Sequence, residues 1–203
     1  MGREQCDSSV KRRDDPMAVG DPNIENVKKA GKEFDSGYDP TEWLLRELFK
    51  KYPNSTSFDE VQLKTRVLNV LYYTNVQAVN VVARHIVNLK GLDSEIATGA
   101  CDAVRRIANV KLSNTKRCFY SFATKYCSWQ NPTAYPIYDS TADACLWFYR
   151  KDKFAEFKRQ DLGTYARFRE IVIAFRKHYN LEAFDFKQLD SYLYHRGQEI
   201  IGK

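Results

Sequence analysis

The sequence lacks a long apolar run, a paired-cysteine motif and a cluster of histidines. No apolar stretch approaches the roughly 18 residues that a membrane-spanning helix needs. The opening "MGREQCDSSVKRRDD" has no apolar centre, as a secretory signal would have. The five cysteines show no C-x-x-C spacing, and the three histidines are scattered. We therefore expect a cytosolic protein with reduced thiols, no membrane association, no bound metal and no cofactor.

Aromatic side chains and positive charge are abundant instead. Aromatic residues make up 14% of the chain, which is enough to build a real core, and the formal net charge is +6. Many basic residues come in doublets, such as Arg105-Arg106 and Lys116-Arg117. This pattern indicates a polyanion such as nucleic acid as partner, although basic doublets also occur on ordinary solvated helix faces.

The chain divides into a polar arm and a helical domain. Residues 1–38 are polar and rich in proline and glycine, and we expect a flexible arm with one short helix near residues 23–32. Residues 39–203 show apolar side chains at helical spacing, broken by short polar connections, and no convincing pair of strands. This favours a single all-α domain, a bundle of about eight helices, acting as a monomer.

One connection is basic and short. The stretch "NVKLSNTK", residues 109–116, separates two expected helices, so we predict a tight helix–turn–helix unit. Backbone N–H groups at a helix N-terminus bind phosphate, and basic side chains strengthen such a site. The alternative is an ordinary turn with solvated lysines. The predicted phosphate contacts here are Lys111, Ser113, Asn114, Lys116 and Arg117.

A second connection places a single carboxylate. In "SFATKYCSWQNPTAYPIYDS", residues 121–140, an aromatic helix breaks at Asn131-Pro132 and an extended segment with Pro136 leads to Asp139, where another helix begins. An Asp at this position is a common helix N-cap, which by itself stabilises a helix by about 1 kcal/mol. Asp139 is therefore either only a cap or also a functional carboxylate.

This arrangement resembles the helix–hairpin–helix DNA glycosylases of compact bacterial, phage-defence type. In that family a short "P-V-D"-like segment carries the catalytic Asp, and "YPIYDS" takes its place here. The segment "VLNVLYYTNVQAVNVVARHI", residues 67–86, is similar to the family's early helix pair, and "SFATKY" is most similar to the archaeal 8-oxoguanine branch. The resemblance spans roughly residues 60–150, but the family's Gly-x-Gly hairpin is replaced by "KLSNTKR".

The resemblance implies a base-excising enzyme acting on double-stranded DNA. Asp139 would stabilise the positive charge that develops on the sugar, or activate water, while the base is extruded. Cys118 stands where bifunctional members carry a nucleophilic lysine, so a monofunctional enzyme is expected. Lys125 matches the second, non-nucleophilic lysine; it either pairs with Asp139 or extends from a helix face with no chemical role.

Further residues follow from the same resemblance. Thr74 and Asn75 occupy the turn that meets the gap in the DNA, and Ser140 follows Asp139 as a phosphate contact or a capping residue. Tyr73, Trp129 and Tyr138 are the candidates for the base pocket, with core packing as the alternative for each. The acids Glu170, Asp185 and Asp190 are expected to be ordinary surface or capping residues.

Two other functions remain open at this point. The chain could be a helical DNA-binding module without catalysis, or a helical protein-interaction domain in which Asp139 only caps. Compact relatives of the resembled type act on modified viral DNA, so the resemblance also suggests antiviral defence with a hypermodified cytosine as substrate, beside a role in DNA repair.

Overall fold

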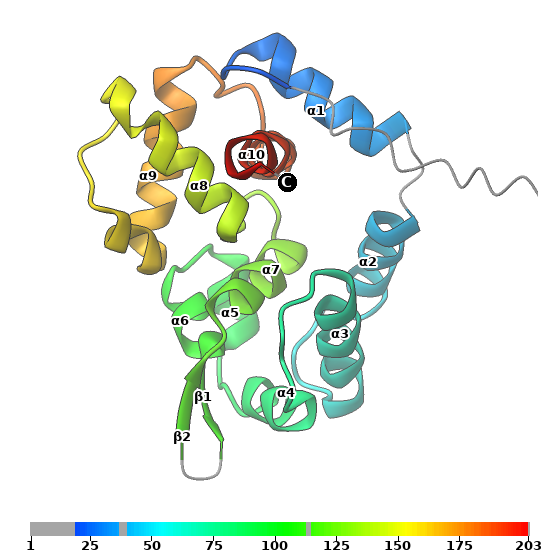
Figure 1. Ribbon diagram of the computed structural model, residues 1–203. Helices are drawn as coiled ribbons and strands as arrows, with labels where there is room; N and C mark the ends of the chain where they lie inside the picture. Colours follow the sequence, from blue (N-terminus) through cyan, green and yellow to red (C-terminus); the bar gives the residue numbers. More distant parts are fainter. Residues whose placement is uncertain (1–18, 37–39, 113–114, 203) are drawn as a thin grey trace, which may run out of the picture.

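The computed structural model describes residues 19–36, 40–112 and 115–202. Over these residues the protein has ten α-helices, two short 3-10 helices and one two-stranded sheet (Figure 1). The expected helical class is therefore confirmed at the level of a mostly helical fold. The expected phosphate contacts Ser113 and Asn114 lie outside the described residues.

The elements follow one another with short connections. In chain order they are α1 Ile24–Ser36, α2 Pro40–Lys51, α3 Phe58–Leu71, α4 Val79–Val87, α5 Leu92–Ala97, α6 Asp102–Ala108, β1 Asn109–Leu112, β2 Thr115–Cys118, α7 Tyr120–Gln130, α8 Ser140–Tyr149, the 3-10 turns Arg150–Asp152 and Arg159–Gly163, α9 Tyr165–His178 and α10 Phe186–Ile201.

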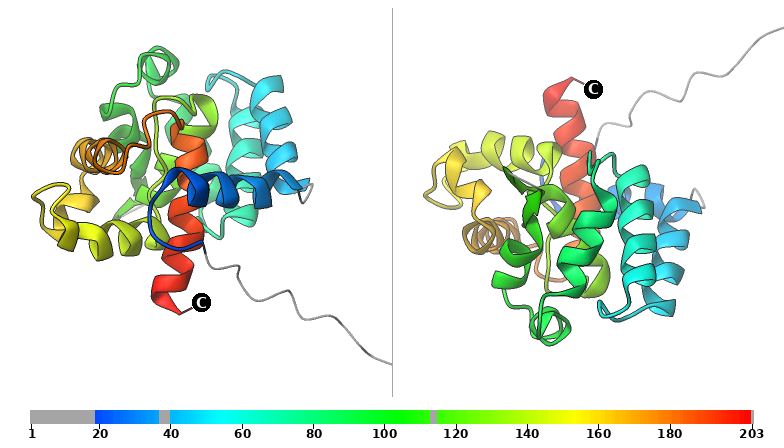
Figure 2. Two further views of the ribbon diagram at one scale, coloured as in Figure 1. Left: turned by 90° about the horizontal axis from the view of Figure 1, so that it is seen from above. Right: turned by 90° about the horizontal axis from the view of Figure 1, so that it is seen from below.

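Helix α10 occupies the middle of the molecule. It packs against α8 along one side and against α1 along another, and Figure 2 shows α1 crossing it. On α1, Val27 and Ala30 are fully buried. The described part of the expected N-terminal arm therefore belongs to the packed body, because α1 has an apolar side that covers α10.

Contact between α8 and α10 is closest at a glycine. A Cβ atom added to Gly197 would lie 2.2 Å from the carbonyl oxygen of Thr141, which is closer than any real contact. Only a residue without a side chain fits there, so α10 approaches the first turn of α8 backbone to backbone. This contact fixes the start of α8, where Asp139 lies.

Several expected boundaries were wrong because local backbone geometry interrupts the helical pattern. Within the helix pair expected over residues 67–86, the second helix begins only at Val79, since Tyr73 and Asn75 both have positive φ angles. The apolar stretch over residues 92–108 is divided into α5 and α6 around Gly99, whose φ is 71°. The division at Gly99 contributes to a helix number above the eight that were expected.

The expected helix–turn–helix at residues 109–116 was also wrong. Strands β1 and β2 form an antiparallel hairpin in which Val110 is opposite Arg117 and Lys111 is opposite Lys116. Val110 is buried while Lys111 is exposed, so the side chains alternate as in a strand rather than following a helical period. The hairpin projects away from the helical body (Figure 1).

None of the described helices combines the length and the apolar character needed to cross a membrane.

Candidate functional site

Asp139 is the N-cap of α8, as the sequence predicted. Its backbone is extended, and its Oδ1 accepts hydrogen bonds from the backbone N–H of Thr141 at 3.0 Å and of Ala142 at 2.9 Å. The Thr141 hydroxyl donates a third hydrogen bond to the same oxygen at 2.5 Å. One carboxylate oxygen therefore satisfies the cap completely, which leaves the other oxygen for a different contact.

The other oxygen, Oδ2, faces a buried lysine. The Nζ of Lys125 on α7 lies 3.7 Å from it, and the side chains of Lys125 and Asp139 are 3% and 26% exposed. This is the first of the two alternatives for Lys125. Burial lowers the pKa of Lys125, and the charge of Asp139 opposes part of that effect. Solvent thus reaches the Asp139 carboxylate but not the Lys125 ammonium.

Two further groups hold the ammonium of Lys125 in place. Its Nζ donates a hydrogen bond to the Ser121 hydroxyl at 2.9 Å and lies 5.3 Å from the centre of the Tyr72 ring. A cation over an aromatic face in a buried site is attracted by the ring. Because the lysine has defined neighbours on several sides, it defines where Oδ2 points.

Hydrogen bonds fasten the extended segment before Asp139 to the helices around it. The Tyr165 hydroxyl donates to the carbonyl of Pro136 at 3.1 Å, and the backbone N–H of Tyr138 donates to the Thr124 hydroxyl at 3.1 Å. The Tyr135 hydroxyl donates to backbone carbonyls of the α5–α6 region. The X-Pro segment therefore gives Asp139 a fixed position rather than a flexible one.

An open hollow brings together four of the predicted DNA contacts. Its volume is about 590 Å³, and it lies between the α3–α4 turn and strand β2. Ser121, which binds Lys125, also lines it, so the hollow reaches the neighbourhood of the ion pair. The predicted contacts that line it are Thr74, Asn75, Lys116 and Arg117.

Two other predicted contacts are exposed. Lys111 lies on β1 directly opposite Lys116, so two positive charges face each other across the hairpin. Ser140 is exposed at the first position of α8. Like charges directly opposite on paired strands are unfavourable, and a bound anion would relieve this repulsion.

The three predicted base-pocket aromatics do not share one pocket. Tyr73 is 90% exposed on the α3–α4 turn. The ring of Tyr138 lies 4.7 Å from that of Tyr120, and its hydroxyl donates to Asp143. Trp129 instead donates from Nε1 to the Tyr72 hydroxyl at 3.1 Å. Trp129 thus contacts Tyr72, whose ring lies beside Lys125.

Sequence reasoning missed the contribution of α10. Asp185 caps α10 through the backbone N–H of Gln188, as expected, but Asp190 is not a surface acid. It is half-buried, and desolvation raises its pKa to about 7, with the charge of Lys187 opposing the rise and that of Asp139 adding to it. The spacing of three between Lys187 and Asp190 places both on one helix face, and this was the only signal in the sequence.

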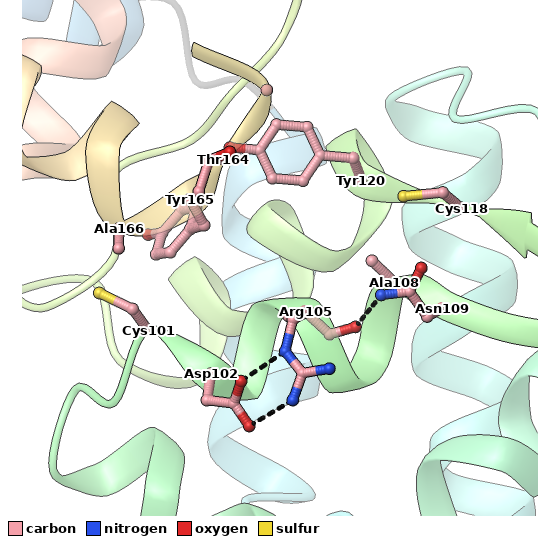
Figure 3. A pocket seen from close by; sticks show the side chains of 11 residues that line it. Cys101, Asp102, Arg105, Ala108, Asn109, Cys118, Tyr120, Thr164, Tyr165 and Ala166 are labelled. Carbon is pink, nitrogen blue, oxygen red and sulfur yellow. Dashed lines mark hydrogen bonds and ion pairs between the residues drawn. The ribbon is translucent and has the colours of Figure 1, made fainter. Parts of the chain in front are cut away.

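A second, smaller hollow shares Cys118 and Tyr120 with the first (Figure 3). Its volume is about 260 Å³ and its walls are mainly apolar. The ion pair of Asp102 and Arg105, at 2.6 Å, lies along one edge, and the thiols of Cys101 and Cys118 lie on different walls. None of the residues predicted for DNA or base contacts lines this hollow.

No group of three or more potential metal ligands occurs among the described residues.

The fold and site define a mostly helical protein with a capping carboxylate, a buried lysine and an adjoining basic hollow. The family model HI_0787_N, described as an N-terminal domain, matches residues 23–134. A relative from Haemophilus influenzae (strain ATCC 51907 / DSM 11121 / KW20 / Rd), described as an uncharacterized protein, is 40% identical over 151 residues, which covers 74% of this chain and 72% of the relative. The chain belongs to this family. No solved structure matches it.

The matched range divides the site. Lys125 and the α3–α4 turn lie inside residues 23–134, whereas Asp139 and α10 lie beyond them. The ion pair of Lys125 with Asp139 therefore joins the part that the family model covers to the part that follows it.

Proposed function

We propose that the protein is a monofunctional DNA glycosylase that hydrolyses the N-glycosidic bond of an extruded modified or damaged base and leaves an abasic site. The observation that carries this proposal is that the two oxygens of the Asp139 carboxylate make different contacts. Oδ1 of Asp139 completes the helix cap, while Oδ2 lies 3.7 Å from the Lys125 ammonium on a side chain that solvent still reaches.

The chemistry needs few groups. As the bond between the base and C1′ breaks, the bonding electrons leave with the base, which takes up a proton, and positive charge develops on the sugar. Oδ2 of Asp139 stabilises that charge, or takes a proton from the water that attacks C1′. Lys125 orients the carboxylate and does not attack the sugar. Its amine already binds Ser121 and Asp139.

The basic hollow supports a DNA backbone as the partner. Lys116 and Arg117 line it with Thr74 and Asn75, and Lys111 stands opposite Lys116 on the projecting hairpin. The salt bridges of the described residues include none of these three cations, so their charge is available to phosphates. The hairpin would take the place of the glycine hairpin that the resembled family uses.

Tyr73 supports a different role from the predicted base pocket. It is 90% exposed and its φ is 49°, a backbone conformation that a bulky residue rarely adopts. A large ring held outward on the turn beside Thr74 and Asn75 can fill the space that an extruded base leaves in the duplex. We therefore assign Tyr73 to the DNA gap rather than to the base.

The decisive experiment is incubation with duplexes that carry single oxidised, alkylated or deaminated bases, or hydroxymethylated and glucosylated cytosines of the viral kind. Released base is detected by mass spectrometry, and abasic sites are detected by strand cleavage in alkali. Release by the wild type supports the proposal, and borohydride is expected to trap no covalent adduct. Absence of release from every duplex contradicts it. Release from the cytosine series alone favours the antiviral setting.

A non-catalytic DNA-binding module is the second candidate. It is favoured by the same cap, because the hydrogen bonds to Oδ1 give Asp139 a complete structural reason to be present. In that case Asp139→Asn binds every duplex as the wild type does, and neither protein releases a base.

A further inference from the structure

Behind the Lys125–Asp139 pair lies a second pair of charges. The Nζ of Lys187 on α10 is 3.1 Å from Oε1 of Glu42 on α2, and both side chains are mostly buried. The same ammonium lies 4.4 Å from the centre of the Trp129 ring. A lysine and a glutamate from opposite ends of the chain therefore meet over an aromatic face.

An aromatic pair connects the two charged pairs. Trp129 donates a hydrogen bond from Nε1 to the Tyr72 hydroxyl at 3.1 Å. Lys187 lies over Trp129, and Lys125 lies 5.3 Å from the centre of the Tyr72 ring. The two lysines thus approach this Tyr–Trp pair separately. The contacts form an unbroken chain from Glu42 to Asp139.

Asp190 completes the group from α10. The charges of Lys187, Asp139, Lys125 and Glu42 all act on its carboxyl, and its own charge acts on Tyr72. Among the described residues, no hydrogen bond or ion pair to its carboxyl is present, whereas Lys187 binds Glu42. At neutral pH its raised pKa lets the carboxyl either donate or accept a proton in a hydrogen bond.

Charged groups of this kind are a costly way to hold helices together. Buried charges are costly to desolvate, and well-packed apolar side chains of similar volume often stabilise a fold equally well. Groups of this kind at the junction between two parts of a chain are typical of a ligand site, where the ligand supplies the missing hydrogen bonds. Here Glu42 and Trp129 come from the range matched by the family model, and Lys187 and Asp190 come from beyond it.

We infer that Lys187 and Asp190 form the subsite that hydrogen-bonds the polar edge of the extruded base, while Asp139 and Lys125 act at the sugar. This rests on the proposed glycosylase function. The subsite selects bases that carry adjacent hydrogen-bonding groups, such as oxidised or hydroxylated bases. It disfavours bases whose modification is only an alkyl group, because these would leave the polar side chains unpaired.

The test separates recognition of the base from folding. Lys187→Met and Asp190→Asn keep side-chain volume, and Lys177→Met and Glu182→Gln are controls on exposed residues. Each is combined with Asp139→Asn so that the base is not released from the bound duplex. Dissociation constants are measured for a duplex with the preferred base and for the same duplex with a stable abasic analogue.

The subsite variants should bind the base-containing duplex roughly 10–100-fold more weakly, as expected for loss of a buried polar contact. Their affinity for the abasic duplex should stay within about twofold of the parent, and the controls should change neither. Equal losses on both duplexes would indicate a structural role, and no loss on either would mean no contact; both results overturn the inference.

A separate measurement, base release, tests the proposed function. Absence of base release by the wild type contradicts glycosylase activity, whatever the binding data show. Base release with unchanged selectivity in Lys187→Met and Asp190→Asn overturns the subsite alone.

Discussion

The carboxylate of Asp139 contacts two partners with two different oxygens: Oδ1 caps α8, and Oδ2 faces the Nζ of Lys125 at 3.7 Å. Capping and chemistry are therefore not alternatives for this residue. The cap orients the side chain, and the orientation presents the second oxygen beside a buried ammonium. The consequences for the fold, for the proposed DNA contacts and for the proposed reaction can each be measured.

Gly197→Ala should displace Asp139 although Gly197 makes no contact with the Asp139 side chain. The new Cβ would lie 2.2 Å from the Thr141 carbonyl oxygen, so the first turn of α8 must move. We expect the free energy of unfolding to fall by about 1–3 kcal/mol, as for overpacked cores, and base release to fall with it. Urea unfolding and a release assay measure both effects.

The matched control is Gly31→Ala. No atom lies within 4 Å of a Cβ added there, and Gly31 is within α1. This change should raise the free energy of unfolding by about 0.5–1 kcal/mol through helix propensity. If both alanine variants behaved alike, α10 would not fix the start of α8.

Tyr73→Gly should separate stability from function. Its φ of 49° is unfavourable for tyrosine and acceptable for glycine, so the substitution relieves backbone strain. We expect the free energy of unfolding to be unchanged or higher by up to about 1 kcal/mol. Release of base should nevertheless fall about tenfold or more, because extrusion loses the ring that fills the gap. Full activity in Tyr73→Gly would remove Tyr73 from the DNA interface.

The hairpin cations should determine the salt dependence of DNA binding. Lys111 and Lys116 face each other on β1 and β2, and both are exposed. The double variant Lys111→Gln, Lys116→Gln should reduce the slope of log Kd against log salt concentration by about one to two, since each lost phosphate contact accounts for about 0.9. The control Lys177→Gln should leave the slope unchanged. An unaltered slope in the double variant would mean that the hairpin does not meet the backbone.

Asp190 should make stability depend on pH. Its pKa rises from 3.8 to about 7 on folding, so the native state binds more protons than the unfolded state between those values. The free energy of unfolding therefore falls as pH rises through this window. Asp190→Asn lacks the effect, and the difference between the two proteins should change by about 1–3 kcal/mol between pH 4 and pH 8. Parallel stability curves would show that Asp190 titrates as an ordinary surface acid.

Short-range signals predicted the elements that carry Asp139. Pro136, the break at Asn131 and the Asp–Ser junction led to α7, an extended segment and α8, and the structure has α8 at Ser140–Tyr149. Pairing of Lys125 with Asp139 was one of two alternatives, because spacing along the sequence cannot tell which way a lysine on an aromatic helix points. In the structure the Lys125 side chain points inward among buried residues of α7, and its ammonium lies beside Asp139.

Contacts between residues distant in the sequence, and residues with a left-handed backbone conformation, could not be predicted from the sequence. The hairpin was missed because residues 109–112 are few, and only their pairing with residues 115–118 makes them a strand. Asp190 and Lys187 were missed because their environment depends on α2 and α7, which are distant in the sequence. The strained turn at Tyr73 is imposed by the Asn69 side chain, which accepts from Thr74 and from the backbone of Val76.

The most direct measurement of the central claim compares base release by the wild type and by Asp139→Asn. Asn caps helices as well as Asp does, so the variant should fold and bind DNA normally. The account predicts that release falls at least about 100-fold, because the charge on Oδ2 is lost while the cap is kept. Release by Asp139→Asn at the wild-type rate would contradict it.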